Sequence, residues 1–195
     1  MAAICRSCSV SLRDFRRIRR HLPKTVAVSV ANALVSSRLD YCNSLFRSLS
    51  SLDLRRLQCI QNSAARIVTN ISKYDHISPV LNSLHWLPVK YRCIFKTCML
   101  VYKYLHSGLP NYFDSYIKRY SSSVRTRRSD PGNLFLDLPV FSPGIHKSKT
   151  HFQYSFSHDG PKLWNDLPLD VRTASSLYSF RHKLKAHLFR LAFPP

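Results

Sequence analysis

The sequence contains no glutamate. Its 195 residues carry ten acidic side chains, all aspartate, against 30 lysines and arginines, so the formal net charge at pH 7 is +20. Repulsion between so many cations opposes compaction, and a folded chain of this charge needs a polyanionic partner or another functional reason for it. Nucleic acid is the first candidate for that partner, and an anionic membrane surface is the second.

Glycine is also scarce, with four residues in the chain. No GxxxxGK[ST] phosphate loop, no GxSxG nucleophile elbow and no HExxH zinc motif occurs. Two-metal phosphoryl transfer needs neighbouring carboxylates, but no two acids are adjacent, and Pro168 separates the closest helical pair, Asp166 and Asp170. We therefore expect no catalytic residues, no cofactor, no metal site and no enzyme activity from this chain alone.

Long apolar runs are missing too: none approaches the roughly 20 residues that span a bilayer. No secretory signal is visible, so we expect an intracellular protein of the nucleus or cytoplasm, neither secreted nor attached to a membrane. The first 22 residues are amphipathic, rich in arginine and serine and poor in acid, as in a mitochondrial transit peptide. An ordinary basic surface helix is the favoured alternative, because the same pattern continues along the whole chain.

The six cysteines do not form a recognisable metal or disulfide pattern. Cys5 and Cys8 have zinc-like spacing, but no second cysteine or histidine pair follows at zinc-finger distance. Most of the cysteines fall at apolar positions of predicted helices. We therefore expect free thiols that are buried as small hydrophobic side chains.

What the sequence does contain is a series of basic amphipathic helices. The best specified follows Ser50, which forms a capping-box pattern with Asp53. Gln61 lies inside the apolar arc of this helix and, if buried, needs a hydrogen-bonding partner, for which segment 37–45 is the nearest candidate. Leu54, Leu57, Ile60, Ala64, Ile67, Val68 and Ile71 share that arc, and Arg55, Asn62, Arg66 and Thr69 lie opposite.

A second basic helix is predicted over residues 3–21. Its apolar arc holds Ile4, Cys8, Leu12, Phe15, Ile18 and Leu22, and its opposite arc holds Arg6, Arg13, Arg17 and Arg20. Four arginines in one stripe can follow a phosphate backbone. A merely solvated charged face is the alternative, but only Asp14 lies nearby to balance it.

Further helices are expected over residues 25–35, 36–46, 76–84, 88–107 and 111–120. A strand is the alternative for 25–35, because that run is rich in β-branched residues, but the alanines and leucine near its end favour a buried helix. Arg92, Lys96 and Lys103 align on the outer face of the helix over 88–107. Gly108 is placed to cap its end. Residues 121–133 lack apolar periodicity and predict a loop, made strongly basic by Arg125, Arg127 and Arg128.

The C-terminal third changes character. Residues 134–140 and 151–156 predict two short strands, the second from its alternating aromatic residues. A turn with a short helix over 160–168 and a last helix capped at Ser175 or Ser176 follow. The expected fold is mainly α: a multi-helix bundle with a small two-stranded β element, arranged as a helical bundle over 1–120, a basic linker over 121–133 and a small α+β extension over 134–195.

Several segments, in this order, resemble the C-terminal part of reverse transcriptases from non-LTR retrotransposons of the LINE, jockey and chicken-repeat type. The set is specific although each match is short. The matching segments are Ser37–Leu45, Leu57–Gln58, Gln61–Arg66, Asp75–Leu81, Leu84–Val89, Tyr91–Arg92, Gly160–Pro168 and Ser179–Arg181.

The resemblance implies a thumb and a post-thumb extension, with the catalytic palm and its paired aspartates upstream of this region. It implies a non-catalytic fragment that binds an RNA or RNA–DNA duplex, with palm and fingers domains as further partners. The alternative is a structural remnant that completes a missing palm, anchored by Trp86, Trp164 and some tyrosines. The candidate nucleic-acid-binding residues are Arg6, Arg13, Arg17, Arg20, Arg55, Arg66, Arg92, Lys96, Lys103, Arg125, Arg127 and Arg128.

Overall fold

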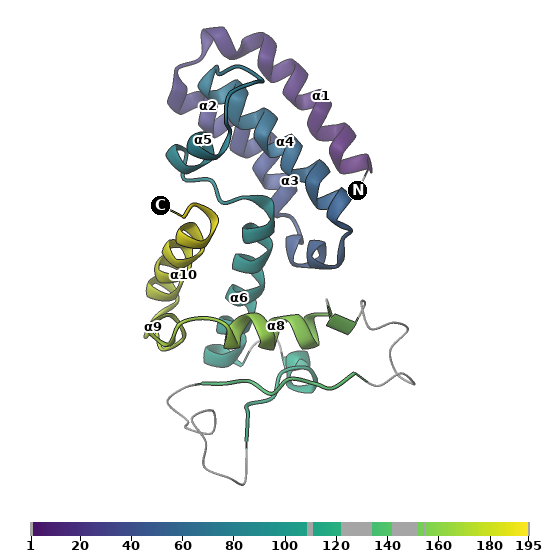
Figure 1. The fold of residues 1–195 in the computed structure, drawn as a ribbon, viewed down its shortest axis with the longest axis vertical. Coiled ribbons are helices and arrows are strands. Elements are labelled where there is room, and N and C mark those ends of the chain that lie inside the picture. The colour runs from purple at the N-terminus through teal and green to yellow at the C-terminus, as the bar shows by residue number, and fades with distance from the viewer. Residues whose placement is uncertain (1, 109–110, 122–133, 142–151, 154, 195) are drawn as a thin grey trace. The chain divides into compact units, whose positions relative to one another are not determined.

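The computed structural model describes residues 2–108, 111–121, 134–141, 152–153 and 155–194, and helices predominate in them (Figure 1). The mainly α fold class is thereby confirmed. The chain forms two compact units. Unit 1 comprises Met1–Cys93 with Phe189–Pro195, and unit 2 comprises Ile94–Leu188. The sequence-based division had instead placed its boundaries at residues 120 and 133.

Unit 1 is built around one long helix, α4, against which α1, α2 and α5 pack (Figure 1). Its core combines buried residues of these helices, among them Phe15 of α1, Ala27 of α2 and Leu57 of α4. The elements of unit 1, in chain order, are α1 (Ala2–Ile18), the 3₁₀ helix η1 (Arg19–His21), α2 (Lys24–Ala31), the π-helical η2 (Asn32–Ser36), α3 (Ser37–Asp40), the 3₁₀ helix η3 (Asn43–Ser48), α4 (Ser51–Thr69), α5 (Ser78–Ser83) and the start of α6 (Val89–Ser107).

Helix α4 begins as its sequence predicts. The Ser50 hydroxyl accepts a hydrogen bond from the Asp53 backbone N–H at 3.1 Å and donates to the Asp53 carboxylate at 3.1 Å. At the other end Asn70 adopts a left-handed conformation with φ 55°, and its N–H bonds to the Arg66 carbonyl. Asparagine tolerates this conformation better than most residues, so it suits the position after the last helical turn.

The two helices predicted over 25–35 and 36–46 are not separate. From Lys24 to Asp40 the chain is helical without a break, because α2, η2 and α3 follow one another directly. No glycine or proline lies in this stretch to end the helix. The turn comes instead at Cys42, whose φ of 50° is left-handed.

Unit 2 is organised by aromatic contacts around α6. The Tyr102 ring stacks on Phe180 of α10 (Leu177–Ala192) with centroids 4.1 Å apart. Trp164 of α8 (Phe156–Asn165) lies 5.7 Å from the same phenylalanine. Helix α8 approaches α6 closely at Gly160, where an added Cβ would meet Val101 at 3.4 Å. The remaining elements of unit 2 are η4 (Asn111–Ser115) and α9 (Leu169–Arg172).

The predicted two-stranded β element is wrong. In the described residues the segment 134–141 forms a single isolated antiparallel bridge, between Leu136 and Arg119, and no strand. Side chains of α8 bond to this segment. Asn165 Oδ1 accepts from the Leu136 N–H at 2.9 Å, and Asn165 Nδ2 donates to the Leu136 carbonyl at 2.8 Å. Trp164 Nε1 donates to the Leu134 carbonyl at 2.8 Å. These bonds satisfy backbone groups that a partner strand would otherwise pair.

The second predicted strand is helical where it is described. Phe152 and Gln153 are helical, Ser155 precedes α8 as its N-cap residue, and α8 begins at Phe156. His151 and Tyr154 lie outside the described residues. Alternating aromatic residues suggested a strand, but Phe152 and Phe156 are also four residues apart, the spacing of one helical face.

The C-terminal end of α6 and the N-terminal end of α10 agree with the predictions. Gly108 follows α6 with φ 65°, and its N–H bonds to the Tyr104 carbonyl at 2.8 Å. The Ser176 hydroxyl accepts from the Ser179 N–H at 3.1 Å and so caps α10. In the described part of the chain, no helix is long and apolar enough to cross a membrane.

Candidate nucleic-acid interface

The arginine stripe of α1 is exposed, as the sequence predicts. Arg6, Arg13 and Arg17 are exposed on α1, and Arg20 is exposed in η1. The opposite face of the helix is buried through Cys8, Leu12 and Phe15. Asp14 lies 3.7 Å from Arg17 across one turn, but both side chains are mostly exposed and such a pair neutralises little in water. The stripe therefore presents positive charge to solvent.

A further arginine, Arg19, joins η1 to the C-terminus of α4. Its Nε donates to the Ile67 carbonyl at 3.0 Å and its Nη2 donates to the Val68 carbonyl at 2.7 Å. Its Nη1 donates to the Leu22 carbonyl at 2.7 Å. The last carbonyls of a helix lack intrahelical partners and carry partial negative charge, which favours a cation there. The half-buried Arg19 is therefore fixed in position by the end of α4.

Arg66 is fixed by the loop that follows α4. Its Nε donates to the Ser72 carbonyl at 3.3 Å and its Nη2 donates to the Asp75 carbonyl at 3.1 Å. The Asp75 carboxylate in turn accepts from the Ser72 N–H at 2.9 Å. The sequence placed Arg66 on the outer face of α4, and the structure adds that it shapes this loop.

The end of α1, η1, the end of α4 and the loop after α4 line an open pocket of about 640 Å³. Its lining contains no acidic residue. The loop side chain Lys73 also extends over the ring of Tyr74, with its Nζ 4.8 Å from the ring centroid. The polar and charged lining residues are Arg16, Arg19, Arg20, Arg66, Asn70 and Lys73.

Sequence reasoning missed Arg16, Arg19 and Lys73. Arg16 stands four residues before Arg20, so helical spacing could have placed it beside the stripe. The role of Arg19 depends on a contact 48 residues away in the sequence, and Lys73 depends on how the loop folds after Asn70. No periodicity carries that information.

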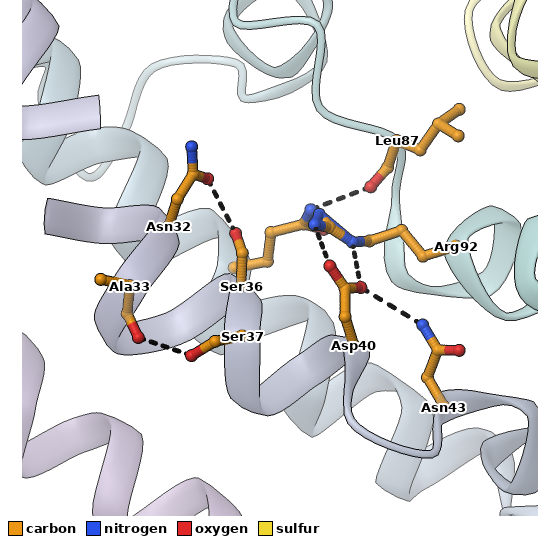
Figure 2. Close-up of polar contacts among 9 residues, drawn as sticks. Asn32, Ala33, Ser36, Ser37, Asp40, Asn43, Leu87 and Arg92 are labelled. Atoms are coloured by element: carbon orange, nitrogen blue, oxygen red, sulfur yellow. Dashed lines mark hydrogen bonds and ion pairs between the residues drawn. The ribbon is translucent and has the colours of Figure 1, made fainter. Parts of the chain in front are cut away.

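Arg92 was predicted as a nucleic-acid contact, and the structure gives it a different partner. Its Nε and Nη2 donate to the two oxygens of Asp40 at 2.9 and 2.8 Å, a two-point ion pair (Figure 2). The Arg92 side chain is 17% exposed. Asn43 also donates to Asp40, at 3.2 Å. We therefore remove Arg92 from the candidate surface, because its guanidinium is engaged within unit 1.

Gln61 is buried and hydrogen-bonded, as its position in the apolar arc requires. Its Nε2 donates to the Leu87 carbonyl at 2.9 Å, and its Oε1 accepts from Gln58 at 3.0 Å. Gln58 Oε1 in turn accepts from the Val89 N–H at 2.9 Å. The partner is therefore the segment before α6, and the suggestion of segment 37–45 is wrong. Segments that carry the retrotransposon resemblance thus bond to one another inside unit 1.

The remaining candidates are not among the residues that line the pocket. Arg55 is exposed near the start of α4. Lys96 and Lys103 are exposed on the part of α6 that belongs to unit 2. Arg125, Arg127 and Arg128 lie outside the described residues.

The cysteines are free thiols, and three of the six are buried. The described residues contain no group of three histidine, cysteine or aspartate side chains placed to hold a metal ion. Cys8, Cys93 and Cys98 are buried, Cys5 is half-buried, and Cys42 and Cys59 are exposed. Burial raises the pKa of the Cys93 thiol to about 11, with the nearby Arg47 opposing this rise. A thiol with so high a pKa is a poor nucleophile at neutral pH.

Comparison of the chain with protein-family models, curated proteins and solved structures finds no match.

Proposed function

We propose that this chain is a non-catalytic, nucleic-acid-binding part of a non-LTR retrotransposon reverse transcriptase, acting in the nucleus or cytoplasm. In this proposal unit 1 holds the backbone of an RNA or RNA–DNA duplex. The observation that carries it is the exposed stripe of Arg6, Arg13, Arg17 and Arg20 beside a pocket whose lining includes four arginines and a lysine. Contacts of arginine and lysine with phosphates bind nucleic acid with little dependence on base sequence.

The experiment is a salt titration of duplex binding by the full chain. Fluorescence anisotropy with an RNA–DNA duplex should show affinity falling steeply and linearly on logarithmic axes between about 50 and 200 mM salt. Replacing Arg13 and Arg17 by alanine should lower the magnitude of this slope by about two, because each lost phosphate contact changes it by about one.

The matched control removes two charges from unit 2, by Lys162→Ala and Arg181→Ala on exposed positions of α8 and α10. We expect this control to leave the slope nearly unchanged. Absent or salt-insensitive binding of the unmodified chain would refute the proposal. An equal loss of slope in both double variants would show that only net charge matters and that the stripe is not the binding surface.

A second candidate function is a structural one, in which the chain completes a missing polymerase domain. It is favoured by the exposed apolar side chains between α3 and α4, where Tyr41 is 77% and Leu45 70% exposed. The suggested tryptophan anchors do not support it, because Trp86 and Trp164 are both buried in the chain. Concentration-dependent association in sedimentation velocity that Leu45→Ser abolishes would favour this function over duplex binding.

A further inference from the structure

The pocket at the end of α4 shares Arg20 with the arginine stripe but differs from it in shape. The stripe lies on the outside of a helix and suits an extended backbone, whereas the pocket is concave. Its volume of about 640 Å³ falls within the roughly 300–1,000 Å³ of small-molecule sites. A concave site of this size accepts a compact group that projects into it, such as the end of a strand or a free nucleotide.

Two of its arginines are held in place by the protein itself. Arg19 is bonded to the carbonyls of Ile67, Val68 and Leu22, and Arg66 to those of Ser72 and Asp75. Guanidinium groups held this way lose little conformational freedom when a ligand binds, which lowers the cost of binding. They also offset the partial negative charge of the helix end, which would otherwise repel an anion.

Three further cations stand at the solvent side of the pocket. Arg16, Arg20 and Lys73 are exposed, and Arg20 Nε donates to His21 Nε2 at 2.9 Å. The five cations of the lining have no acidic side chain among them. Such a density of positive charge suits a ligand with several negative charges in a small volume, which a single backbone phosphate does not provide.

An aromatic ring lies next to one of these cations, Lys73. The Tyr74 ring is 83% exposed, although the Lys73 ammonium lies over it. Exposed aromatic rings beside cations are the common platform for stacking a nucleobase. The pairing of a phosphate pocket with an open ring therefore points to a ligand that carries both phosphates and a base.

We propose that this pocket binds a nucleoside 5′-triphosphate group, with its phosphates among Arg16, Arg20 and Lys73 and its base on Tyr74. That group occurs at the 5′ end of an RNA strand and in a free nucleotide. The strand-end form rests on the proposed nucleic-acid binding, whereas the free-nucleotide form does not.

The test compares RNAs of identical sequence, labelled at the 3′ end, that carry either a 5′-triphosphate or a 5′-hydroxyl, and adds ATP as a third ligand. Binding is measured with the full chain in EDTA. We expect the triphosphate RNA to bind at least about tenfold more tightly, since extra phosphate contacts add to the affinity. The double variant Arg20→Ala with Lys73→Ala should reduce the ratio of the two affinities to about one. Tyr74→Ala should weaken ATP binding about tenfold, because the base loses the ring on which it stacks.

The matched control is Arg6→Ala with Arg13→Ala, which removes two charges from α1 outside the pocket. This control should weaken the binding of both RNAs equally and leave the ratio of their affinities unchanged. Circular dichroism checks that every variant folds.

The possible outcomes separate the two proposals. A ratio near one with no ATP binding overturns the pocket assignment, whether or not duplex binding holds. If ATP binds and the double variant Arg20→Ala with Lys73→Ala abolishes this binding, the pocket assignment is supported with a free nucleotide as the ligand. This holds even if the chain binds no RNA and the proposed function fails. A preference for triphosphate RNA that remains in the double variant Arg20→Ala with Lys73→Ala also overturns the pocket assignment.

Discussion

At the scale of single residues, the partner of an arginine decides its role. Arg13 and Arg17 are exposed to solvent, Arg19 and Arg66 are bonded to backbone carbonyls, and Arg92 is bonded to Asp40. Four of them were predicted on the outer faces of basic amphipathic helices, and Arg19 lies in the short 3₁₀ helix η1. Their sequence spacing predicts which face each occupies, but it does not show whether another segment meets that face.

The Asp40–Arg92 pair gives a prediction at this scale. In a double-mutant cycle with Asp40→Ala and Arg92→Ala, measured by urea unfolding, we expect a coupling energy of about 1–2 kcal/mol. Hydrogen bonds to charged groups contribute about 1.5–3 kcal/mol, and the Asp40 side chain is 45% exposed, so solvent screening reduces the value. A coupling near zero would contradict the two-point geometry.

The same variants test the reassignment of Arg92. Arg92→Ala, if the variant folds, should leave the salt slope of duplex binding unchanged. The double variant Arg13→Ala with Arg17→Ala should instead lower it. A slope lowered by about one would restore Arg92 to the binding surface.

At the scale of elements, the ends of the helices follow local chemistry closely. Ser50 caps α4, Ser176 caps α10, and Gly108 ends α6 in a left-handed conformation. Each of these contacts spans four residues or fewer, so the sequence alone predicts it. The predicted strand over 134–140 failed because a strand requires a partner at long range, and side chains of α8 bond to this segment instead. The predicted strand over 151–156 failed because Phe152, Gln153 and Phe156 are helical.

The cap of α4 gives the prediction for an element. Ser50→Ala should lower the free energy of unfolding by about 1 kcal/mol, because the Asp53 N–H loses its acceptor. Ser51→Ala, one residue later and exposed, is the matched control and should change stability by less than about 0.5 kcal/mol. Urea unfolding followed by circular dichroism measures both, and equal effects would exclude a capping role.

At the scale of the whole molecule, several aspartates serve the fold. Asp53 completes a helix cap, Asp40 binds Arg92, Asp75 holds the loop after α4, and Asp114 accepts from the Tyr104 hydroxyl at 2.6 Å. These local roles leave the net charge of +20 largely unbalanced at the surface. A molecule of this kind attracts polyanions over distances of a Debye length, about 10 Å at 0.1 M salt.

The absence of paired carboxylates in the sequence gives the prediction for the whole molecule. The purified chain, supplied with a primed RNA template, deoxynucleotides and Mg²⁺, should extend no primer, because phosphoryl transfer needs carboxylates that hold metal ions together. A complete reverse transcriptase under the same conditions is the positive control. Measurable extension by the chain alone would overturn the non-catalytic assignment.

The long helices, their caps, their buried faces and the positive charge could be predicted from the sequence, because these depend on side chains within one or two turns of each other. The position of Gln61 in an apolar arc also predicted that it needs a hydrogen-bonding partner. That this partner is Leu87, that Arg92 bonds to Asp40, and that Arg19 and Lys73 join Arg66 around a pocket follows from the folded structure alone. Those contacts join segments that are distant in the sequence or depend on the path of a loop, and no periodic pattern encodes them.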